Sequence, residues 1–262
     1  MVQGFDPRVT PFAVDSEPPV RGYLHYPSVP AEVSQPPTAD HLRPASDLRQ
    51  ALVLAHGAGS NCQAPLLVAV ATTFAAAGFT VLRCDLPYRQ KRPHGPPLGS
   101  AAEDQRGLRN AVTALRELAP DRPFRRVYLG GHSYGGRQAT TLAADDAALV
   151  GGLLLLSYPL HPPRKPEQLR TAHFPKLRTP AMFVHGSRDP FGSLEEMESA
   201  LKLIPAVTIL LPVEGAGHDL SFKPSRPSRL SAPLEKGGRH GAVNDLPGIV
   251  VAAFCPWSAS LG

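Results

Sequence analysis

A serine stands between glycines in the stretch LGGHSYGG, residues 129–136. Gly131 and Gly135 lie two places on either side of Ser133, after an apolar run and before a segment of helical pattern. In a strand-to-helix turn of this kind the two backbones approach closely, so glycines are needed, and the serine hydroxyl is lifted to the carboxyl edge of the sheet. The pattern predicts that Ser133 is a nucleophile. The alternative is a glycine-rich turn whose serine takes no part in chemistry.

A serine hydroxyl attacks well only when a base removes its proton and a carboxylate orients that base. On this kind of turn the acid and then the histidine follow the serine in the chain, each just past a strand. Asp189 follows the apolar run AMFVHG, and His218 follows VTILLPV, so both meet this condition. Asp85 precedes the serine and Asp219 adjoins the histidine, so both are weaker candidates for the acid. We therefore expect Ser133, Asp189 and His218 to act together.

Acyl transfer through a serine also needs two backbone N–H groups that hold the oxyanion. One is expected from Tyr134, the residue after the nucleophile. The other is expected from the turn HGAGSN, residues 56–61, where Ala58 is favoured and Gly59 is next. Three further histidines are expected to hold turns or pack in the core: His56, His132 and His185.

Strands and helices alternate along the chain around these residues. Continuous apolar runs separated by helical segments predict a mostly parallel, twisted sheet with helices on both faces, an α/β fold. Serine and glutamate stand in capping-box spacing at 100 and 103 and again at 193 and 196. Strands are expected at 51–55, 79–88, 125–131, 151–158, 181–186 and 207–213, and helices at 62–77, 100–119, 135–146 and 193–204.

Proline content divides the chain into three parts. We expect an α/β core over 46–220, preceded over 1–45 by an antiparallel edge hairpin and a disordered, proline-rich link. A basic, proline-rich segment over 221–262 follows, and its sequence allows a closing helix at 245–256.

Composition narrows the function classes. A chain of 262 residues with 42% hydrophobic residues can form one sizeable domain. No apolar run reaches membrane-spanning length, the start resembles no signal peptide, and the three cysteines lie far apart, which together predict a cytoplasmic protein away from membranes. The net charge is +5, but aromatic residues do not alternate with the basic residues, so no nucleic-acid partner is expected. No metal-ligand spacing or nucleotide-binding glycine motif occurs, so we expect neither metal nor cofactor.

Six segments in order resemble the α/β-hydrolase superfamily: AHGAGSN, LRCDLPYR, GGHSYGGR, LSYPLHPP, FVHGSRDPFG and GAGHDL. They are similar to its dienelactone-hydrolase-like branch and, within it, to bacterial relatives of the testis-expressed and chromatin-complex-subunit hydrolase-like proteins, over about residues 15–220. The resemblance implies an α/β-hydrolase fold and a Ser133–Asp189–His218 triad. Dienelactone hydrolases proper use a cysteine nucleophile, and Ser133 departs from that pattern. Basic residues cluster at 83–92 and 164–178, where they could form a positive rim around the site. Together with this rim, the resemblance suggests six substrate-binding residues: Asp85, Tyr88, Arg89, Tyr158, His161 and Arg164.

These observations predict a metal-free serine hydrolase that cleaves an ester or related acyl bond through a covalent acyl-enzyme. Its substrate is expected to be a small acyl compound, anionic if Arg89 and Arg164 bind it. Esterases, thioesterases and amidases share such a site, so the sequence leaves that choice open, along with the oligomeric state. The alternative is a catalytically silent hydrolase-fold protein that acts as a binding or scaffold module.

Overall fold

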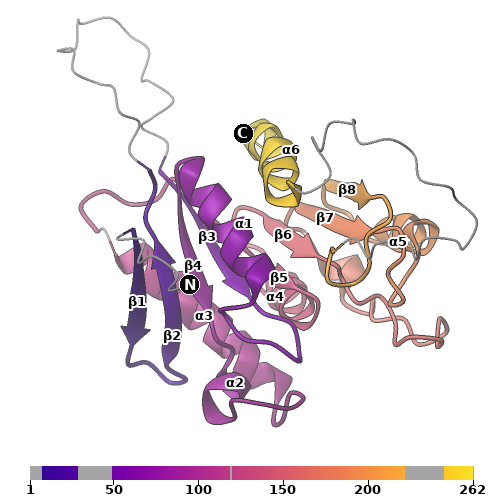
Figure 1. Cartoon of the computed structure of the whole chain (residues 1–262), viewed down its shortest axis with the longest axis horizontal. Helices are drawn as coiled ribbons and strands as arrows, with labels where there is room; N and C mark the ends of the chain where they lie inside the picture. Colours follow the sequence, from indigo (N-terminus) through magenta and orange to yellow (C-terminus); the bar gives the residue numbers. More distant parts are fainter. Residues whose placement is uncertain (1–7, 29–48, 119, 222–244, 262) are drawn as a thin grey trace, which may run out of the picture.

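One eight-stranded sheet organises the molecule, in the order β1-β2-β4-β3-β5-β6-β7-β8 (Figure 1). A computed structural model describes residues 8–28, 49–118, 120–221 and 245–261. The strands from β4 to β8 in this order are parallel, and the β1–β2 hairpin adds to β4 in antiparallel fashion. The strands are β1 Val9–Val14, β2 Val20–His25, β3 Gln50–Ala55, β4 Phe79–Cys84, β5 Arg126–His132, β6 Leu153–Leu156, β7 Ala181–Gly186 and β8 Thr208–Val213.

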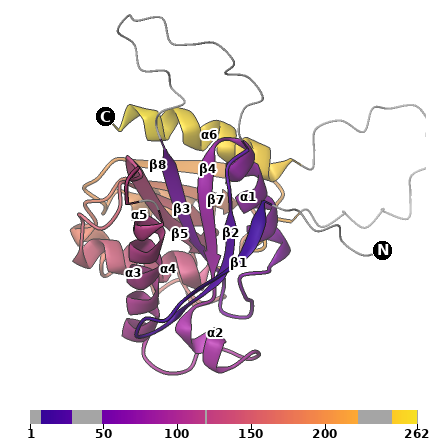
Figure 2. The ribbon, with the colours of Figure 1, turned by 90° about the vertical axis from the view of Figure 1, so that its left-hand side faces the viewer.

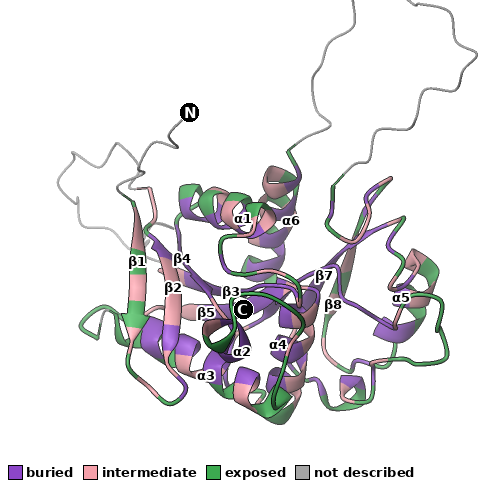
Figure 3. Ribbon diagram, turned by 60° about the horizontal axis from the view of Figure 1, so that its bottom comes forward, coloured by how far each residue is buried: buried purple, intermediate pink, exposed green. Residues whose placement is uncertain are grey.

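Helices cover both faces of this sheet, as the alternation of apolar strands and helices predicts (Figure 2). On one face α1 (Pro65–Ala76) and α6 (Leu246–Ser260) pack over an aromatic core. On the other face lie α3 (Ala101–Glu117), α4 (Tyr134–Asp145) and α5 (Leu194–Leu201). The central strands β3, β5, β6 and β7 are buried along nearly their whole length (Figure 3). The expected mostly parallel α/β architecture is confirmed.

The strand expected over 79–88 is shorter, because β4 ends at Cys84. Pro87 instead begins the short helix α2, Pro87–Lys91. Proline has no N–H for a sheet ladder, but its fixed φ suits the first turn of a helix. This turn away from the sheet brings residues 85–89 back over the carboxyl edge, where the candidate site lies.

Both helix starts with capping-box spacing are capped, in different ways. Ser193 and Glu196 form the full reciprocal box at the start of α5. Ser100 accepts from the Ala102 N–H at the start of α3, whereas the carboxylate of Glu103 pairs with Lys91.

Both ends of the described chain join the core. The hairpin of β1 and β2 lies at the sheet edge, and the helix α6 spans most of the segment in which a closing helix is allowed. Phe254, in α6, is fully buried against Phe74 and Tyr128. The expected proline-rich link and the basic segment fall at 29–48 and 222–244, outside the described residues.

All three cysteines are free thiols, and within the described ranges no helix is long and apolar enough to span a membrane.

Candidate active site

Ser133 occupies a strained turn between β5 and α4, with φ of +50°. This left-handed region is unfavourable for a residue with a side chain. Gly131 and Gly135 allow the turn to sit against β3. A Cβ at Gly131 would lie 2.4 Å from the Ala55 carbonyl oxygen, and one at Gly135 would lie 2.7 Å from the His56 carbonyl oxygen. The close approach of backbones inferred from the sequence is therefore present at both glycines.

The structure brings together the three residues that the sequence order selected. The Ser133 Oγ lies 2.8 Å from Nε2 of His218, and Nδ1 of His218 lies 3.0 and 2.8 Å from the two carboxylate oxygens of Asp189. The Asp189 side chain is fully buried, whereas 21% of the His218 side chain is exposed. With Nδ1–H donating to the carboxylate, Nε2 of His218 is free to accept the serine proton.

Two residues that sequence reasoning missed as site residues hold His218 and Asp189 in place. Phe191 donates its N–H to Asp189 Oδ1 at 2.9 Å, and its ring lies 4.1 Å from the His218 ring, centroid to centroid. His132, expected only to pack or hold a turn, lies with Nε2 2.8 Å from the His218 carbonyl oxygen. Burial lowers the pKa of His132, which keeps its ring uncharged beside His218. In the sequence, the only indication that Phe191 belongs to the site is its position two residues after Asp189.

The turn after β3 lies directly against the serine. A Cβ on Gly57 would be 3.5 Å from the Ser133 Cβ. Within the described residues, no acceptor meets the N–H of Ala58 or of Tyr134, so both donors are available to an oxyanion. His56 holds this turn as expected, with Nδ1 at 2.8 Å from the Gly57 carbonyl oxygen and Nε2 accepting from the Leu86 N–H.

Asp85, Tyr88 and Arg89, which are expected to bind substrate, have side chains that contact the loop after β3. Asp85 accepts from the Cys62 N–H at 2.7 Å, and Tyr88 donates its hydroxyl hydrogen to the Ala58 carbonyl at 2.8 Å. Arg89 is buried and donates to four backbone carbonyls. Their side chains brace the turn that carries the candidate oxyanion donors.

Tyr158, His161 and Arg164, which are also expected to bind substrate, lie in the segment that follows β6. Tyr158 is buried against Phe174, and its hydroxyl donates to the Arg170 carbonyl. Both ring nitrogens of the buried His161 are engaged, with the Pro162 carbonyl and the Glu196 carboxylate. Arg164 is exposed on its loop. Within the part of the chain that the structure describes, none of these side chains forms a hydrogen bond with Ser133, His218 or Asp189. The segment reaches the site through its backbone, where the His161 N–H donates to the Phe191 carbonyl.

Asp104 is a further buried residue that the sequence did not single out. Its carboxylate accepts from the Tyr134 hydroxyl at 2.7 Å and from the Tyr88 N–H at 3.2 Å. Burial raises its pKa. Asp104 ties the residue that follows the nucleophile to the start of α2. Its place in the first turn of α3 resembles an ordinary solvated helix start, so spacing gave no signal.

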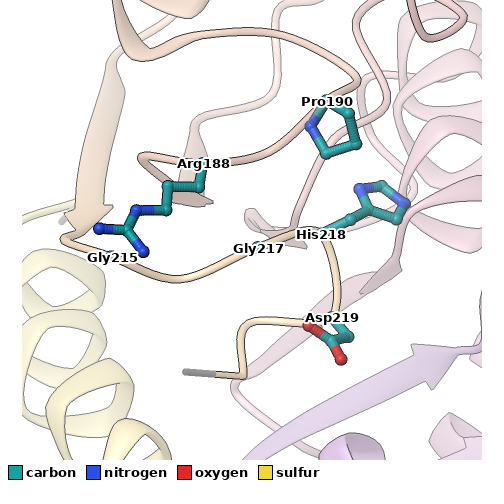
Figure 4. Close-up of a pocket in the computed structure, with 6 residues that line it drawn as sticks. All are labelled: Arg188, Pro190, Gly215, Gly217, His218 and Asp219. Carbon is teal, nitrogen blue, oxygen red and sulfur yellow. The ribbon is translucent and has the colours of Figure 1, made fainter. Parts of the chain in front are cut away.

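A pocket of about 400 Å³ opens beside His218 (Figure 4). The described residues that line it come from the loops after β7 and β8: Arg188, Pro190, Gly215, Gly217, His218 and Asp219. Arg188 is exposed at this pocket, across from the histidine in Figure 4. Among the described residues, no group of three or more histidine, cysteine or acidic side chains is placed to hold a metal ion.

A model of the family described as an alpha/beta hydrolase domain matches residues 48–236, more than half of the chain. Among solved structures, a dienelactone hydrolase from Anabaena variabilis is similar over 96% of each chain, with 19% identity and a TM-score of 0.62. A lidless α/β serine hydrolase from Xanthomonas campestris matches 97% of this chain and 96% of its own, with 16% identity and a TM-score of 0.60. An esterase from Pyrococcus furiosus matches 84% and 88%, with 14% identity and a TM-score of 0.60. These structural likenesses show the fold.

Proposed function

Because the chain belongs to the alpha/beta hydrolase domain family, we propose that it is a serine hydrolase that cleaves a carboxylic ester or related acyl bond. One observation carries the proposal. Ser133 stands on a strained turn with its Oγ 2.8 Å from His218, whose other ring nitrogen meets the buried carboxylate of Asp189. Strain of this kind persists where the surrounding structure enforces it, and it is concentrated at reactive sites.

The mechanism follows from these contacts. His218 Nε2 takes the proton as Ser133 Oγ attacks the acyl carbon, and Asp189 stabilises the imidazolium that forms. The N–H groups of Tyr134 and Ala58 receive the negative charge on the former carbonyl oxygen. The tetrahedral intermediate collapses as His218 returns the proton to the leaving oxygen, which leaves an acyl group on Ser133. Water, deprotonated by His218, then releases the acid and restores the serine.

The pocket beside His218 is placed for the leaving group, since His218 is the group that protonates the departing oxygen. Its volume suits a small substrate. Arg89 is occupied by carbonyls, so a preference for anionic substrates would rest on the exposed Arg188. We extend the proposal to a cytoplasmic enzyme of the dienelactone-hydrolase-like branch, closest to the bacterial relatives of the testis-expressed group, on the strength of the six sequence segments.

Hydrolysis of short p-nitrophenyl esters tests the proposal. We expect wild type to release product with an initial burst of one equivalent, and Ser133→Ala to lose about 10³-fold or more in kcat/KM. Ser157→Ala is the matched control, because Ser157 is buried, also has φ of +50°, and its hydroxyl has no partner among the described residues. Equal loss in both variants would contradict the role of Ser133. A folded wild type without turnover would favour the scaffold alternative.

A further inference from the structure

Arg89 is a buried cation that faces carbonyl groups rather than a carboxylate. It is 5% exposed, and its guanidinium donates to the carbonyls of Ala58, Ser60, Arg92 and Gly95 at 2.7–3.1 Å. No carboxylate of the described chain lies within ion-pair distance of it. A buried charge without a counter-ion is costly, so carbonyl dipoles must offset its desolvation. The positive charge of Arg89 therefore acts on the turn after β3, which contributes the carbonyls of Ala58 and Ser60.

The carbonyls of Gly57 and Ala58 are held on the same side of the turn. The Ala58 carbonyl accepts from the Tyr88 hydroxyl at 2.8 Å and from Arg89 Nη2 at 2.9 Å. The Gly57 carbonyl oxygen lies 3.3 Å from the same Tyr88 hydroxyl and 2.8 Å from Nδ1 of His56. One phenol oxygen thus meets two successive carbonyls. Both must point towards Tyr88.

The N–H groups of Ala58 and Gly59 consequently point the other way. In a trans peptide the N–H is opposite the carbonyl of the same peptide unit, and these peptides are trans. Successive N–H groups on one side form a concavity that binds anions. Gly57 packs against Ser133, so this concavity adjoins the nucleophile. The hydrogen bonds that the carbonyls accept also polarise the N–H groups cooperatively.

We propose that Arg89 is a positioning residue for the oxyanion: through the Ala58 carbonyl it aims and strengthens the N–H donors of the turn after β3. This inference rests on the proposed serine hydrolase activity. Arg89 touches no substrate atom. Its contribution appears when negative charge forms on the substrate oxygen, because the turn it holds is complementary to that charge rather than to the neutral carbonyl.

A second buried arginine provides a matched control. Arg83 is 3% exposed and donates to the Cys62 carbonyl of the same loop, four residues beyond Ala58. We expect Arg89→Met to lower kcat for ester hydrolysis by about 10²-fold, with KM changed less than about twofold, the pattern of a lost oxyanion contact. Arg83→Met should lower kcat by less than about tenfold. Arg89→Lys, which keeps the charge, should recover part of the rate.

A direct readout is the ionisation of a bound oxyanion. A trifluoromethyl ketone labelled with carbon-13 at its carbonyl adds to Ser133 as a hemiketal, and the chemical shift of that carbon reports the pKa of the hemiketal oxygen. We expect the pKa to be higher in Arg89→Met than in wild type and in Arg83→Met. If Arg89→Met does not fold, Tyr88→Phe removes the other donor to the Ala58 carbonyl, and the same rise is expected.

An unchanged hemiketal pKa in the folded variants, or equal kcat losses in the two arginine variants, would overturn the positioning role while leaving the serine mechanism intact. A wild type that forms no hemiketal and hydrolyses no ester would instead remove the proposed function, and with it this inference. The two failures are therefore distinguishable.

Discussion

Ser133 keeps an unfavourable backbone conformation because backbone hydrogen bonds on both sides fix the turn that contains it. A non-glycine residue with φ of +50° costs on the order of 1–3 kcal/mol. The Ser133 N–H donates to the Leu156 carbonyl, and the Gly135 N–H donates to the His56 carbonyl. These bonds join the turn to β6 and to the end of β3. The serine hydroxyl is aimed at His218 by backbone contacts on both sides.

Gly135→Ala tests this dependence at the scale of one residue. The added Cβ would lie 2.7 Å from the His56 carbonyl oxygen, so the turn or the end of β3 must shift. We expect the free energy of unfolding to fall by about 1–3 kcal/mol, and ester hydrolysis to fall at least about tenfold, since small misplacements of a nucleophile are costly. Urea denaturation and steady-state kinetics measure the two effects.

Gly59→Ala is the stability control for this substitution. Open space surrounds a Cβ at Gly59, with no described atom within 4 Å, so its free energy of unfolding should match that of wild type. A Gly135→Ala protein as stable and as active as wild type would show that the close approach of the turn to β3 is not required.

At the scale of elements, most strands and helices could be read from the sequence. Apolar runs such as LLLL in β6 can only be buried on both faces, and α5 begins at a serine with glutamate three residues on. The end of β4 was placed too late because residues 86–88 continue the apolar pattern. The strand nevertheless ends before Pro87, because proline has no N–H to donate to a neighbouring strand but can begin the helix α2.

The proximity of Ser133, Asp189 and His218 was predictable because each residue follows a strand, and parallel strands end at one edge of the sheet. The bracing of the turn after β3 was not predictable. It depends on Tyr88 and Arg89 reaching carbonyls about thirty positions earlier in the chain, across the gap between the ends of β4 and β3. Such contacts arise from the way α2 folds back over the sheet edge, and neither periodicity nor spacing encodes them. The sequence therefore pointed to these two residues as part of the site, but their contacts with the turn after β3 could not be predicted from it.

At the scale of the whole molecule, the two faces of the sheet form separate cores. One contains α3, α4 and α5, and the other contains α1 and α6. The helix α6 carries no charged residue and lies far along the chain from α1, yet it completes the second core through Phe254 and Trp257. The helix α6 begins after Asp245, whose carboxylate caps it by accepting from the Gly248 N–H. A stable sheet consequently depends on residues beyond the site loops.

Three fully or partly buried histidines make the stability of the whole fold depend on pH. Burial lowers the pKa of His56, of His132 and of His173, the last from 6.5 to about 4. The unfolded chain thus binds more protons than the folded chain between these values, so stability is full above about pH 6.5 and is lost as the pH falls towards 4. Asp104, whose pKa burial raises, acts in the opposite direction.

Urea denaturation across this pH range checks the expectation. The free energy of unfolding should decrease as the pH falls from about 6.5 to about 4. His173→Gln, which removes one titrating ring that is hydrogen-bonded to the buried Thr140 of α4, should reduce that slope. Stability that stays constant over the window, or an identical slope in the variant, would show that these rings are not buried in their neutral form.

The central claim is that His218, oriented by Asp189, activates Ser133. Intact-mass measurement of labelling by a fluorophosphonate probe tests it most directly. We expect wild type to gain one label per chain, Ser133→Ala to gain none, and Asp189→Asn to react on the order of 10³–10⁴ times more slowly because the histidine loses its orienting carboxylate. A folded wild type that takes no label, or an Asp189→Asn protein that reacts as fast as wild type, would contradict the account.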